Sequence, residues 1–346
     1  DLHIAFVGRL WFLARANAAM VSPMRFLSGI QPSGNLHLGN YFGAVREHVR
    51  SQDSGESYYF IADYHALTTV RDAERLRGLV RDVAIIYLAS GIDPARSVLY
   101  RQSDVPEVCE LTWMLMTVTP MPMLENATSY KDKIARGITA DAGLFTYPVL
   151  MAADILCQDC DVVPVGKDQV QHVEMARDIG QKFNRLFKSE VFKIPAYRLG
   201  SAPYVPGTDG AKMSKSYGNT IDILAEGRAL EKAVMGIKTD STPPDQPKDP
   251  ETNTVFQLYK MLATPEEADA MAARFRASGP AGISYGQAKK DLLAKIEAHF
   301  APIRERAKAL SADPARVDAI LRDGAVKARA NARAVLDRAR KACGLA

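Results

Sequence analysis

Two stretches of this chain, far apart in sequence, carry residues suited to binding phosphates. The first, SGIQPSGNLHLGNYFGAV at residues 28–45, holds four glycines between a short apolar run and a segment with helical spacing. Glycine lets the backbone approach a ligand closely, and a helix that begins near His37 directs its free N–H groups and positive dipole end to the same place. His37 and Asn40 lie one helical turn apart, so both side chains can face one phosphate group. The alternative is a tight turn that only connects two elements.

The second stretch, GAKMSKSYGN at residues 210–219, places Lys212 and Lys215 three residues apart among small side chains. Lysine is a flexible point charge that suits phosphates, and a mobile cationic loop of this kind can stabilise charge that develops on leaving pyrophosphate. Standing alone, the same residues would more often form a solvated basic turn. Neither stretch is a Walker loop, because the chain contains no G-x-x-x-x-G-K-[ST] pattern.

A third segment, YPVLMAADIL at residues 147–156, combines apolar side chains with a carboxylate. Helical spacing places four side chains on one face: Tyr147, Leu150, Met151 and Asp154. A buried carboxylate without a partner is costly, so Asp154 needs a hydrogen-bond donor. Two interpretations stay open: the donor belongs to a ligand, such as an indole N–H, or Asp154 caps a helix or forms a salt bridge within the protein.

These segments lie within a chain that alternates β-rich runs with helical patterns. The predicted strands are residues 25–30, 58–62, 97–100 and 161–165. Such alternation predicts an α/β fold, a Rossmann-like parallel sheet with helices on its faces. Ligands bind such sheets beyond the carboxyl ends of the strands, which is where the glycine-rich loop lies. After a proline-rich stretch at 239–253 the patterns are helical, which predicts three parts: an extension at 1–23, a catalytic domain at 24–220 and an all-helical domain at 221–346.

Composition narrows the class of protein further. The chain has 346 residues, a net charge of +4 and no apolar run long enough to span a membrane. Four scattered cysteines are too few for a disulfide framework and fit a reducing compartment such as the cytoplasm. We interpret the C-x-x-C spacing of Cys157 and Cys160 as coincidence, because a zinc site needs four ligands and no second pair follows; no metal ligands are predicted.

The two ends of the chain support weaker expectations. Residues 301–346 hold eleven Lys or Arg against five Asp or Glu, which fits either a surface for a phosphate backbone or a solvated helical face. Residues 1–23 begin without methionine, and their apolar run is broken by Arg9 and Arg15. A targeting peptide is one interpretation. We favour a native start at Met20 or Met24 and a dispensable extension before it.

Taken together, the segments resemble a known family. HLGN at residues 37–40 and an intact KMSKS at 212–216 resemble the two signatures of class I aminoacyl-tRNA synthetases. SGIQPSGNLHLGNY, YFIADYHALT, GLFTYPVLMAADIL and VPVGKDQVQHVEMARDI are similar, in order and spacing, to bacterial-type tryptophanyl-tRNA synthetases. The resemblance runs from about Arg25 to the C-terminus. It implies a homodimeric ligase that activates L-tryptophan with ATP and Mg²⁺, then charges tRNA(Trp), with residues 221–346 binding the anticodon.

The resemblance also implies roles for individual residues. Those implied in catalysis are His37, Asn40, Lys133, Lys212 and Lys215. Those implied to bind ATP are Gln31, Pro32, Ser33, Gly39, Asn40, Gly166, Lys167, Asp168, Lys212, Met213, Ser214, Lys215 and Ser216. Those implied to bind tryptophan are His65, Tyr147, Met151, Asp154, Val163, Val165 and Gln169, with Asp154 as acceptor for the indole N–H.

Two departures from the family pattern and three rival functions remain. The chain has Leu124-Glu125-Asn126 where the family often has a basic third residue, and residues 201–210 differ from the commonest version. One rival is a tyrosyl-tRNA synthetase, whose pocket must serve a phenol. The second is a small-molecule nucleotidyltransferase that shares the His-Gly loop, and the third is a catalytically inactive, RNA-binding synthetase paralogue. The last would be free to lose His37, the two loop lysines or Asp154, all of which are present.

Overall fold

The structure is a computed structural model that describes residues 23–345 apart from 33, 136, 138–140, 167–168 and 201–203. The predictions for residues 1–22, Ser33, Lys167 and Asp168 lie outside the described residues. So does the prediction for the side chain of Lys133.

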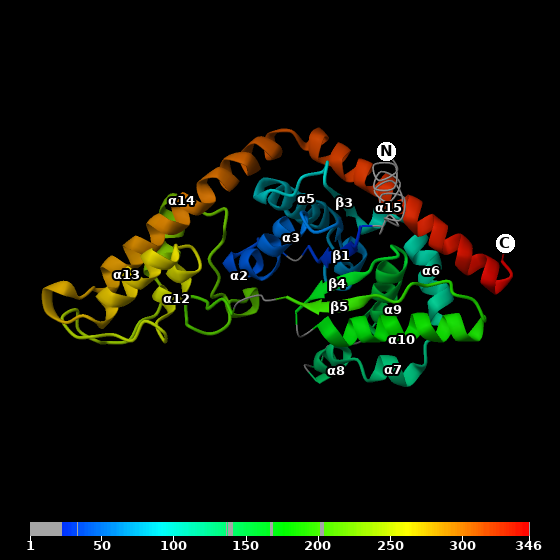
Figure 1. Ribbon diagram of the computed structural model, residues 1–346, viewed down its shortest axis with the longest axis horizontal. Coiled ribbons are helices and arrows are strands. Elements are labelled where there is room, and N and C mark those ends of the chain that lie inside the picture. The colour runs from blue at the N-terminus through cyan, green and yellow to red at the C-terminus, as the bar shows by residue number, and fades with distance from the viewer. Residues whose placement is uncertain are drawn as a thin grey trace, which may run out of the picture.

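A five-stranded parallel sheet forms the centre of the molecule (Figure 1). Its strands are β1 (Arg25–Ile30), β2 (Glu56–Ile61), β3 (Ser97–Arg101), β4 (Val162–Val165) and β5 (Ala196–Leu199), in the order β3-β2-β1-β4-β5. The four predicted strands are present, and the α/β Rossmann-like prediction is confirmed. The fifth strand was not predicted.

The strand order reverses between β1 and β4. The chain builds outward from β1 through β2 to β3, then returns to lay down β4 and β5 on the other side. β1 and β4 share a single paired position, Phe26 with Val162, so the two strands part toward their carboxyl ends. A crevice at such a reversal is where open α/β sheets bind ligands.

Helices cover both faces of the sheet and extend beyond it. Before the third strand the chain forms α2 (Leu38–Asn40), a π-helical turn (Tyr41–Val45), α3 (Arg46–Ser51), α4 (Asp63–Ala66) and α5 (Ala73–Ser90). After it come a 3-10 turn (Gln102–Asp104), α6 (Glu107–Met116), α7 (Met121–Glu125), α8 (Thr128–Ala135), α9 (Ala142–Leu156) and α10 (Val170–Leu186). The C-terminal part holds α11 (Gly227–Met235), α12 (Thr254–Lys260), α13 (Pro265–Arg276), α14 (Tyr285–Ala312) and α15 (Pro314–Cys343).

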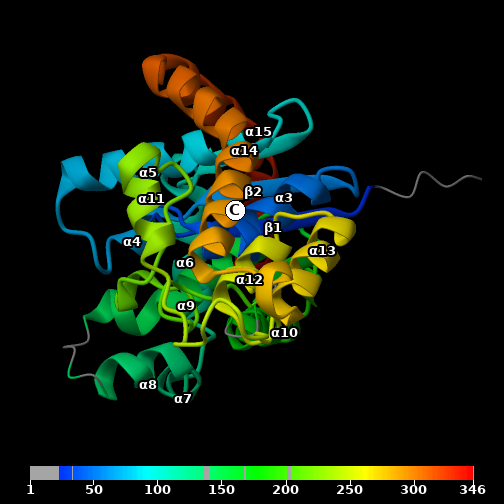
Figure 2. The ribbon, with the colours of Figure 1, turned by 90° about the vertical axis from the view of Figure 1, so that its left-hand side faces the viewer.

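Two hydrophobic cores result from the alternation of side chains along the strands. On β2, Tyr59 and Ile61 point to the core shared with α5, α11, α12 and α14, whereas Tyr58 and Phe60 point to the core shared with α6, α9 and α10. In Figure 2, α5 and α11 lie on one side of the strands and α9 and α10 on the other. No helix in the described part of the chain is long and apolar enough to cross a membrane.

The last helix joins the helical part of the molecule to the sheet. α14 packs against α12 near one end and against α5 further along, and α15 then runs beside β3 and α6 (Figure 1). The sequence predicts one helical domain at residues 221–346. Within this part of the chain, α15 lies on the central sheet and covers its edge strand, because a stripe of small residues (Gly324, Ala325, Ala328 and Ala332) lets it come close.

The docking of α15 depends on Gly324, and we expect Gly324→Val to destabilise the protein. A Cβ at this position would lie 2.0 Å from the carbonyl oxygen of Leu99, which is backbone and cannot turn aside. Overpacking of this kind costs about 1–3 kcal/mol or more. Urea unfolding measures the loss. Gly78→Ala on α5 is the control, since nothing lies within 4 Å of its added methyl and alanine is favoured in helices. Equal stability of the two variants would contradict the docking.

Candidate active site

A cavity of about 610 Å³ occupies the crevice between β1 and β4. Its walls come from the carboxyl ends of β1 and β4, the helix that follows His37, α9 and the start of α10. Nine of the residues predicted from the sequence line it: Gln31, Asn40, His65, Tyr147, Met151, Val163, Val165, Gly166 and Gln169. Segments separated by more than a hundred residues in sequence therefore meet at one place. It lies beyond the carboxyl ends of the strands, where a ligand beside the glycine-rich loop was expected.

The two signature segments contact each other next to Asn40, which lines this cavity. The backbone N–H of Gly39 donates to Sδ of Met213 at 3.3 Å, and the N–H of Leu38 donates to the carbonyl of Ile221 at 3.0 Å. The Nζ of Lys215 reaches across to the glycine-rich loop, where it lies 3.6 Å from the position of a Cβ on Gly34. The lysine loop therefore packs directly on the loop that follows β1.

His37 is neutral in this environment. Its side chain is buried, and the ring fills the space beside Gly39, where a Cβ would lie only 2.9 Å from it. Burial, reinforced by the ammonium of Lys215, lowers the pKa of His37 to about 4, although Asp222 acts in the opposite direction. Its Nδ1 has no partner within the described part of the chain. Near neutral pH the imidazole can thus donate or accept one hydrogen bond, but it carries no charge.

Asn40 caps a helix, in addition to its predicted role in binding phosphate. Its Oδ1 accepts the backbone N–H of His37 at 3.2 Å, which caps the start of α2. The cap fixes the turn that carries His37 and leaves Asn40 in the wall of the cavity. The two side chains therefore lie at the same helix start, as the spacing predicted.

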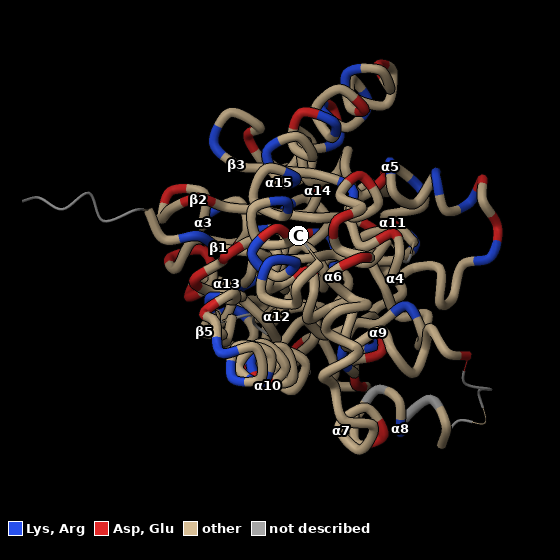
Figure 3. Tube along the Cα trace, turned by 90° about the vertical axis from the view of Figure 1, so that its right-hand side faces the viewer, with Lys and Arg blue, Asp and Glu red and all other residues tan. Residues whose placement is uncertain are grey.

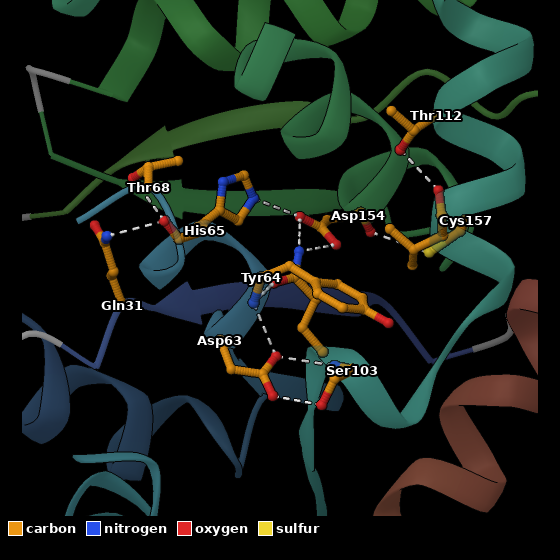
Figure 4. A network of polar contacts seen from close by, with 11 residues as sticks. Gln31, Asp63, Tyr64, His65, Thr68, Ser103, Thr112, Asp154 and Cys157 are labelled. Atoms are coloured by element: carbon orange, nitrogen blue, oxygen red, sulfur yellow. Dashed lines mark hydrogen bonds and ion pairs between the residues drawn. The ribbon is translucent and has the colours of Figure 1, made fainter. Parts of the chain in front are cut away.

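Asp154 is not among the residues that line the cavity, and its carboxylate accepts hydrogen bonds from the protein itself (Figure 4). The residue is 3% exposed, and its carboxylate accepts from Nε2 of His65 at 2.9 Å and from Nε2 of Gln102, which is 2.8 Å from each oxygen. Burial raises the pKa of Asp154, and the hydrogen bonds from His65 and Gln102 oppose this shift. His65, rather than Asp154, lines the cavity. Asp154 therefore has hydrogen-bond partners within the protein. An indole N–H would either add to these donors or take the place of His65.

Gln102 is a site residue that the sequence reasoning missed. Its Oε1 accepts the backbone N–H of Tyr64 at 3.0 Å, so its NH₂ group must face Asp154. A second carboxylate nearby, Asp63, accepts from the backbone and hydroxyl of Ser103 (Figure 4). The available signal was position: Gln102 directly follows β3, at the carboxyl edge of the sheet where ligands bind.

The part of the cavity that α9 and β4 line is apolar with few polar groups. Met151, Val163 and Val165 contribute aliphatic surface, and Tyr147 adds a ring whose hydroxyl is 2.8 Å from Nε2 of His172. The rings of His65 and Tyr147 meet edge to face at 6.1 Å. Apolar walls with a small number of oriented polar groups are typical of sites for small ligands, and this one suits a flat aromatic ring.

The C-x-x-C pair does not take part in the site. The thiols of Cys157 and Cys160 are buried and donate to the carbonyls of Asp154 at 3.3 Å and Ile155 at 3.4 Å. Burial raises the pKa of Cys160 to about 12 and that of Cys157 well above its usual range. Both are therefore neutral, hydrogen-bonded thiols, which fits the interpretation of their spacing as coincidence.

Comparison with known proteins identifies the class that this fold and site define. The profile of the family described as tRNA synthetases class I (W and Y) matches residues 20–301. The tryptophan–tRNA ligase of Rhodopirellula baltica is 52% identical, over 93% of this chain and 100% of the relative, and that of Fusobacterium nucleatum is 48% identical, over 93% and 98%. The crystal structure of tryptophanyl-tRNA synthetase from Campylobacter jejuni complexed with ADP and tryptophan has a TM-score of 0.88 at 46% identity, over 93% of this chain and 100% of that one.

The chain therefore belongs to the bacterial-type tryptophanyl-tRNA synthetases, within class I. The resemblance drawn from the HLGN and KMSKS segments is confirmed. The tyrosyl interpretation is disfavoured, since the relatives at this level of identity act on tryptophan by name. A likeness to the tyrosyl-tRNA synthetase of Archaeoglobus fulgidus, at 19% identity and a TM-score of 0.63, concerns the fold alone.

Proposed function

We propose that this chain activates L-tryptophan with ATP to give tryptophanyl-adenylate and pyrophosphate, and then transfers tryptophan to the 3′-terminal adenosine of tRNA(Trp) with release of AMP. This is the activity of the family to which it belongs. The observation that carries the proposal is the meeting of both signature segments, through Gly39 and Met213 and through Lys215, at a cavity on the strand-order reversal.

In the activation step, the carboxylate of tryptophan attacks the α-phosphorus of ATP. A new bond forms between a carboxylate oxygen and the α-phosphorus, and the bond between the α-phosphorus and the pyrophosphate oxygen breaks. The nucleophile is already an anion, so positioning and electrostatic stabilisation replace a general base. Neutral His37 would donate a hydrogen bond, and Lys212 and Lys215 would offset the charge on the pyrophosphate. Asn40 belongs to the same set, as does Lys133 by resemblance.

The cavity divides naturally between the two substrates. We assign the nucleotide to its outer part, beside the glycine-rich loop, Gly166 and the lysine loop with Met213, Ser214 and Ser216. We assign the side chain of tryptophan to the inner part, between Tyr147, Met151 and the two β4 valines. We assign the amino acid's polar end to Gln169, which lines the cavity at the start of α10.

Mg²⁺ enters the proposal as a partner of the ATP phosphates. Among the described residues there is no group of three or more His, Cys, Asp or Glu side chains placed to hold a metal ion. The charged side chains of the lysine loop are cationic. The ATP phosphates, rather than protein side chains, would therefore hold the metal, which would screen their charge. The protein's own residues would position the two substrates.

The tRNA would contact the C-terminal helices, where unstacked anticodon bases can be read. Lys, Arg, Asp and Glu are interspersed over α14 and α15 (Figure 3). Arg329 forms a bidentate ion pair with the buried Glu107 on α6, at 2.9–3.2 Å, so its charge already holds α15 to the catalytic part. Arg333 is exposed and pairs with Asp337 one turn away. Charge reversal at Arg333 is therefore the cleaner probe of tRNA binding.

We also propose a homodimer, working in the cytoplasm, whose interface includes the outer face of α6. Trp113 on α6 is 67% exposed, and Met121, at the start of α7, is 58% exposed. Large exposed apolar side chains can mark interaction surfaces. Trp113→Glu should therefore halve the molar mass measured by light scattering, because a charge in an apolar interface is costly. Val326→Glu, at a valine 69% exposed on α15, should leave the mass unchanged; a dimer that survives Trp113→Glu places the interface elsewhere.

The decisive experiment is ATP–pyrophosphate exchange measured with each of the twenty amino acids, followed by charging of tRNA(Trp). Exchange with tryptophan alone, together with charging, is the expected result. Exchange with tyrosine would favour the tyrosyl rival, and no exchange with any amino acid would favour an inactive RNA-binding relative.

A further inference from the structure

The lysine loop is a built structure that begins well before the lysines. The N–H of Gly207 donates to the carbonyl of Ala211 at 2.7 Å, and the N–H of Met213 donates to the carbonyl of Val205 at 2.9 Å. Pro206 and Lys212 face each other across this narrow hairpin. The backbone of the first lysine is therefore fixed from one side by residues 205–207.

Asn219 fixes the same segment from the other side. It is 2% exposed, and its Oδ1 accepts the backbone N–H of Ser214 at 2.8 Å. Its Nδ2 donates to the carbonyl of Lys212 at 3.1 Å and to Oδ1 of Asp209 at 2.7 Å. These bonds determine the amide orientation, because only the oxygen can accept from Ser214 and only the nitrogen can donate to Lys212. One side chain thus bridges the backbone on both sides of Met213.

Two neighbours are adapted to this side chain. A Cβ on Gly207 would lie 2.2 Å from the amide of Asn219, so only glycine leaves room for it. Asp209, the acceptor for Nδ2, also accepts the backbone N–H of Ala211 at 3.0 Å. The hydrogen bond from Asn219 lowers the pKa of Asp209, so the carboxylate remains an ionised acceptor. The result is a closed ring of contacts from residue 207 to residue 219.

The same ring sets where the lysines and Met213 stand. Met213 is buried, and its Sδ accepts from Gly39 in the glycine-rich loop. The N–H of Ser216 donates to Oγ of Ser214 at 3.3 Å, and this bond starts the 3-10 turn that carries Lys215. Asn219 holds the backbone of Ser214 and so positions both the anchor and the turn. A misplacement of about 1 Å can cost 10²-fold in rate. The position of this backbone therefore affects the rate of the activation step.

We propose that Asn219 is a positioning residue for the activation step: its amide holds Lys212 and Lys215 in the geometry that stabilises the departing pyrophosphate. The inference rests on the proposed function and deepens it, since Asn219 is buried and is not among the residues that line the cavity. It acts through the backbone of the loop, so its removal should loosen the loop and slow the chemistry while the rest of the fold stays intact.

The test compares Asn219→Ala with the wild-type enzyme in three measurements. We expect kcat for tryptophan-dependent pyrophosphate exchange to fall by about 10–100-fold while KM for ATP stays within about threefold, the pattern of an interaction used in the transition state. Trypsin should cut after Lys212 and Lys215, both exposed, about tenfold faster, as a locally opened segment allows. The thermal midpoint should fall by no more than a few degrees, because the lost hydrogen bonds are confined to this loop. Unchanged kcat and unchanged cleavage would overturn the proposal, and so would a loss of kcat that merely follows a lower midpoint.

A matched control separates positioning from general loosening. Asn184 makes the same kind of tie elsewhere: its Oδ1 accepts the N–H groups of Val191 and Phe192, and its Nδ2 donates to the carbonyl of Phe192 at 2.9 Å. Asn184→Ala removes as many loop hydrogen bonds far from the lysines, so kcat should remain within about twofold. An equal loss of kcat in both variants would overturn the specific role of Asn219.

An exchange of partners tests the contact itself. Asn219→Asp keeps an acceptor for Ser214 but sets a second carboxylate against Asp209, so it should be impaired at least as much as Asn219→Ala. Adding Asp209→Asn removes the repulsion between the two carboxylates, while the Lys212 carbonyl stays without its donor, so kcat should recover in part and at least to the level of Asn219→Ala. A double variant that stays below Asn219→Ala would overturn the proposal. The tryptic readout does not depend on activity: if the wild-type enzyme failed to activate tryptophan, the proposed function would fail, while the tie made by Asn219 could still be measured.

Discussion

Replacing Lys215 with alanine is expected to lower kcat for tryptophan activation by about 10²-fold or more, the scale for loss of one preorganised donor, while KM for ATP changes much less. The structure gives the reason. The Lys215 ammonium reaches the glycine-rich loop beside Gly34, and it is close enough to His37 to lower the pKa of that ring. Burial lowers the pKa of Lys215 itself, and Asp222 opposes that shift. A charge partly removed from water interacts more strongly with a developing anion.

Pyrophosphate exchange at saturating tryptophan, with ATP varied, measures both constants. Lys232→Ala is the control, because Lys232 is an exposed lysine on α11, the helix that follows the same loop. It removes an equal charge outside the cavity and should leave kcat within about twofold. An unchanged kcat with a raised KM in Lys215→Ala would mean that the loop only binds ATP and does not act on the transition state.

The sheet was predictable to the extent that its strands are buried. β1 and β2 are apolar runs between turn residues, and β2 is buried along nearly all its length, so its sequence alone marks it. β5 has the sequence AYRL, and all four of its residues are exposed. Its formation depends on pairing with β4, which precedes it by a whole helix. The local sequence does not show that a distant strand will pair with it, so β5 was not predicted.

The site shows the same limit at the level of single side chains. Helical spacing could say that a buried Asp154 needs a donor, but not which one. The donors, His65 and Gln102, stand 89 and 52 residues away in sequence. The spacing of α15 likewise predicted a helix but not its position on β3, which follows from the contact of Gly324 with the Leu99 carbonyl. Residue types therefore predicted the chemistry of the site, and tertiary contacts decided its pairings.

Specificity provides the second large expected effect, because tryptophan presents a single indole N–H donor and no acceptor on a large flat ring. We expect Asp154→Ala to cut kcat/KM for tryptophan by about 10–200-fold, at 1.4 kcal/mol per tenfold change. Phenylalanine has no donor for the carboxylate, and sites built around one hydrogen bond reject such analogues by about 10⁴-fold. Activation of phenylalanine should therefore suffer far less in the variant, or improve.

The pairing of Asp154 makes a second variant necessary. Alanine leaves the donors of His65 and Gln102 without an acceptor in a buried place, which costs about 1–3 kcal/mol for each, so part of any loss in Asp154→Ala is a loss of folding. Asp154→Asn keeps the shape and one acceptor oxygen for those donors, but it removes the charge that strengthens a bond to the indole. Exchange with tryptophan and with phenylalanine, measured on both variants beside their thermal midpoints, separates the two effects. A selective loss for tryptophan in Asp154→Asn, at an unchanged midpoint, assigns the indole contact to this carboxylate. Proportional losses for both amino acids would instead mean that Asp154 only orients His65 and Gln102, and that the donor from tryptophan is met by another group in the cavity wall.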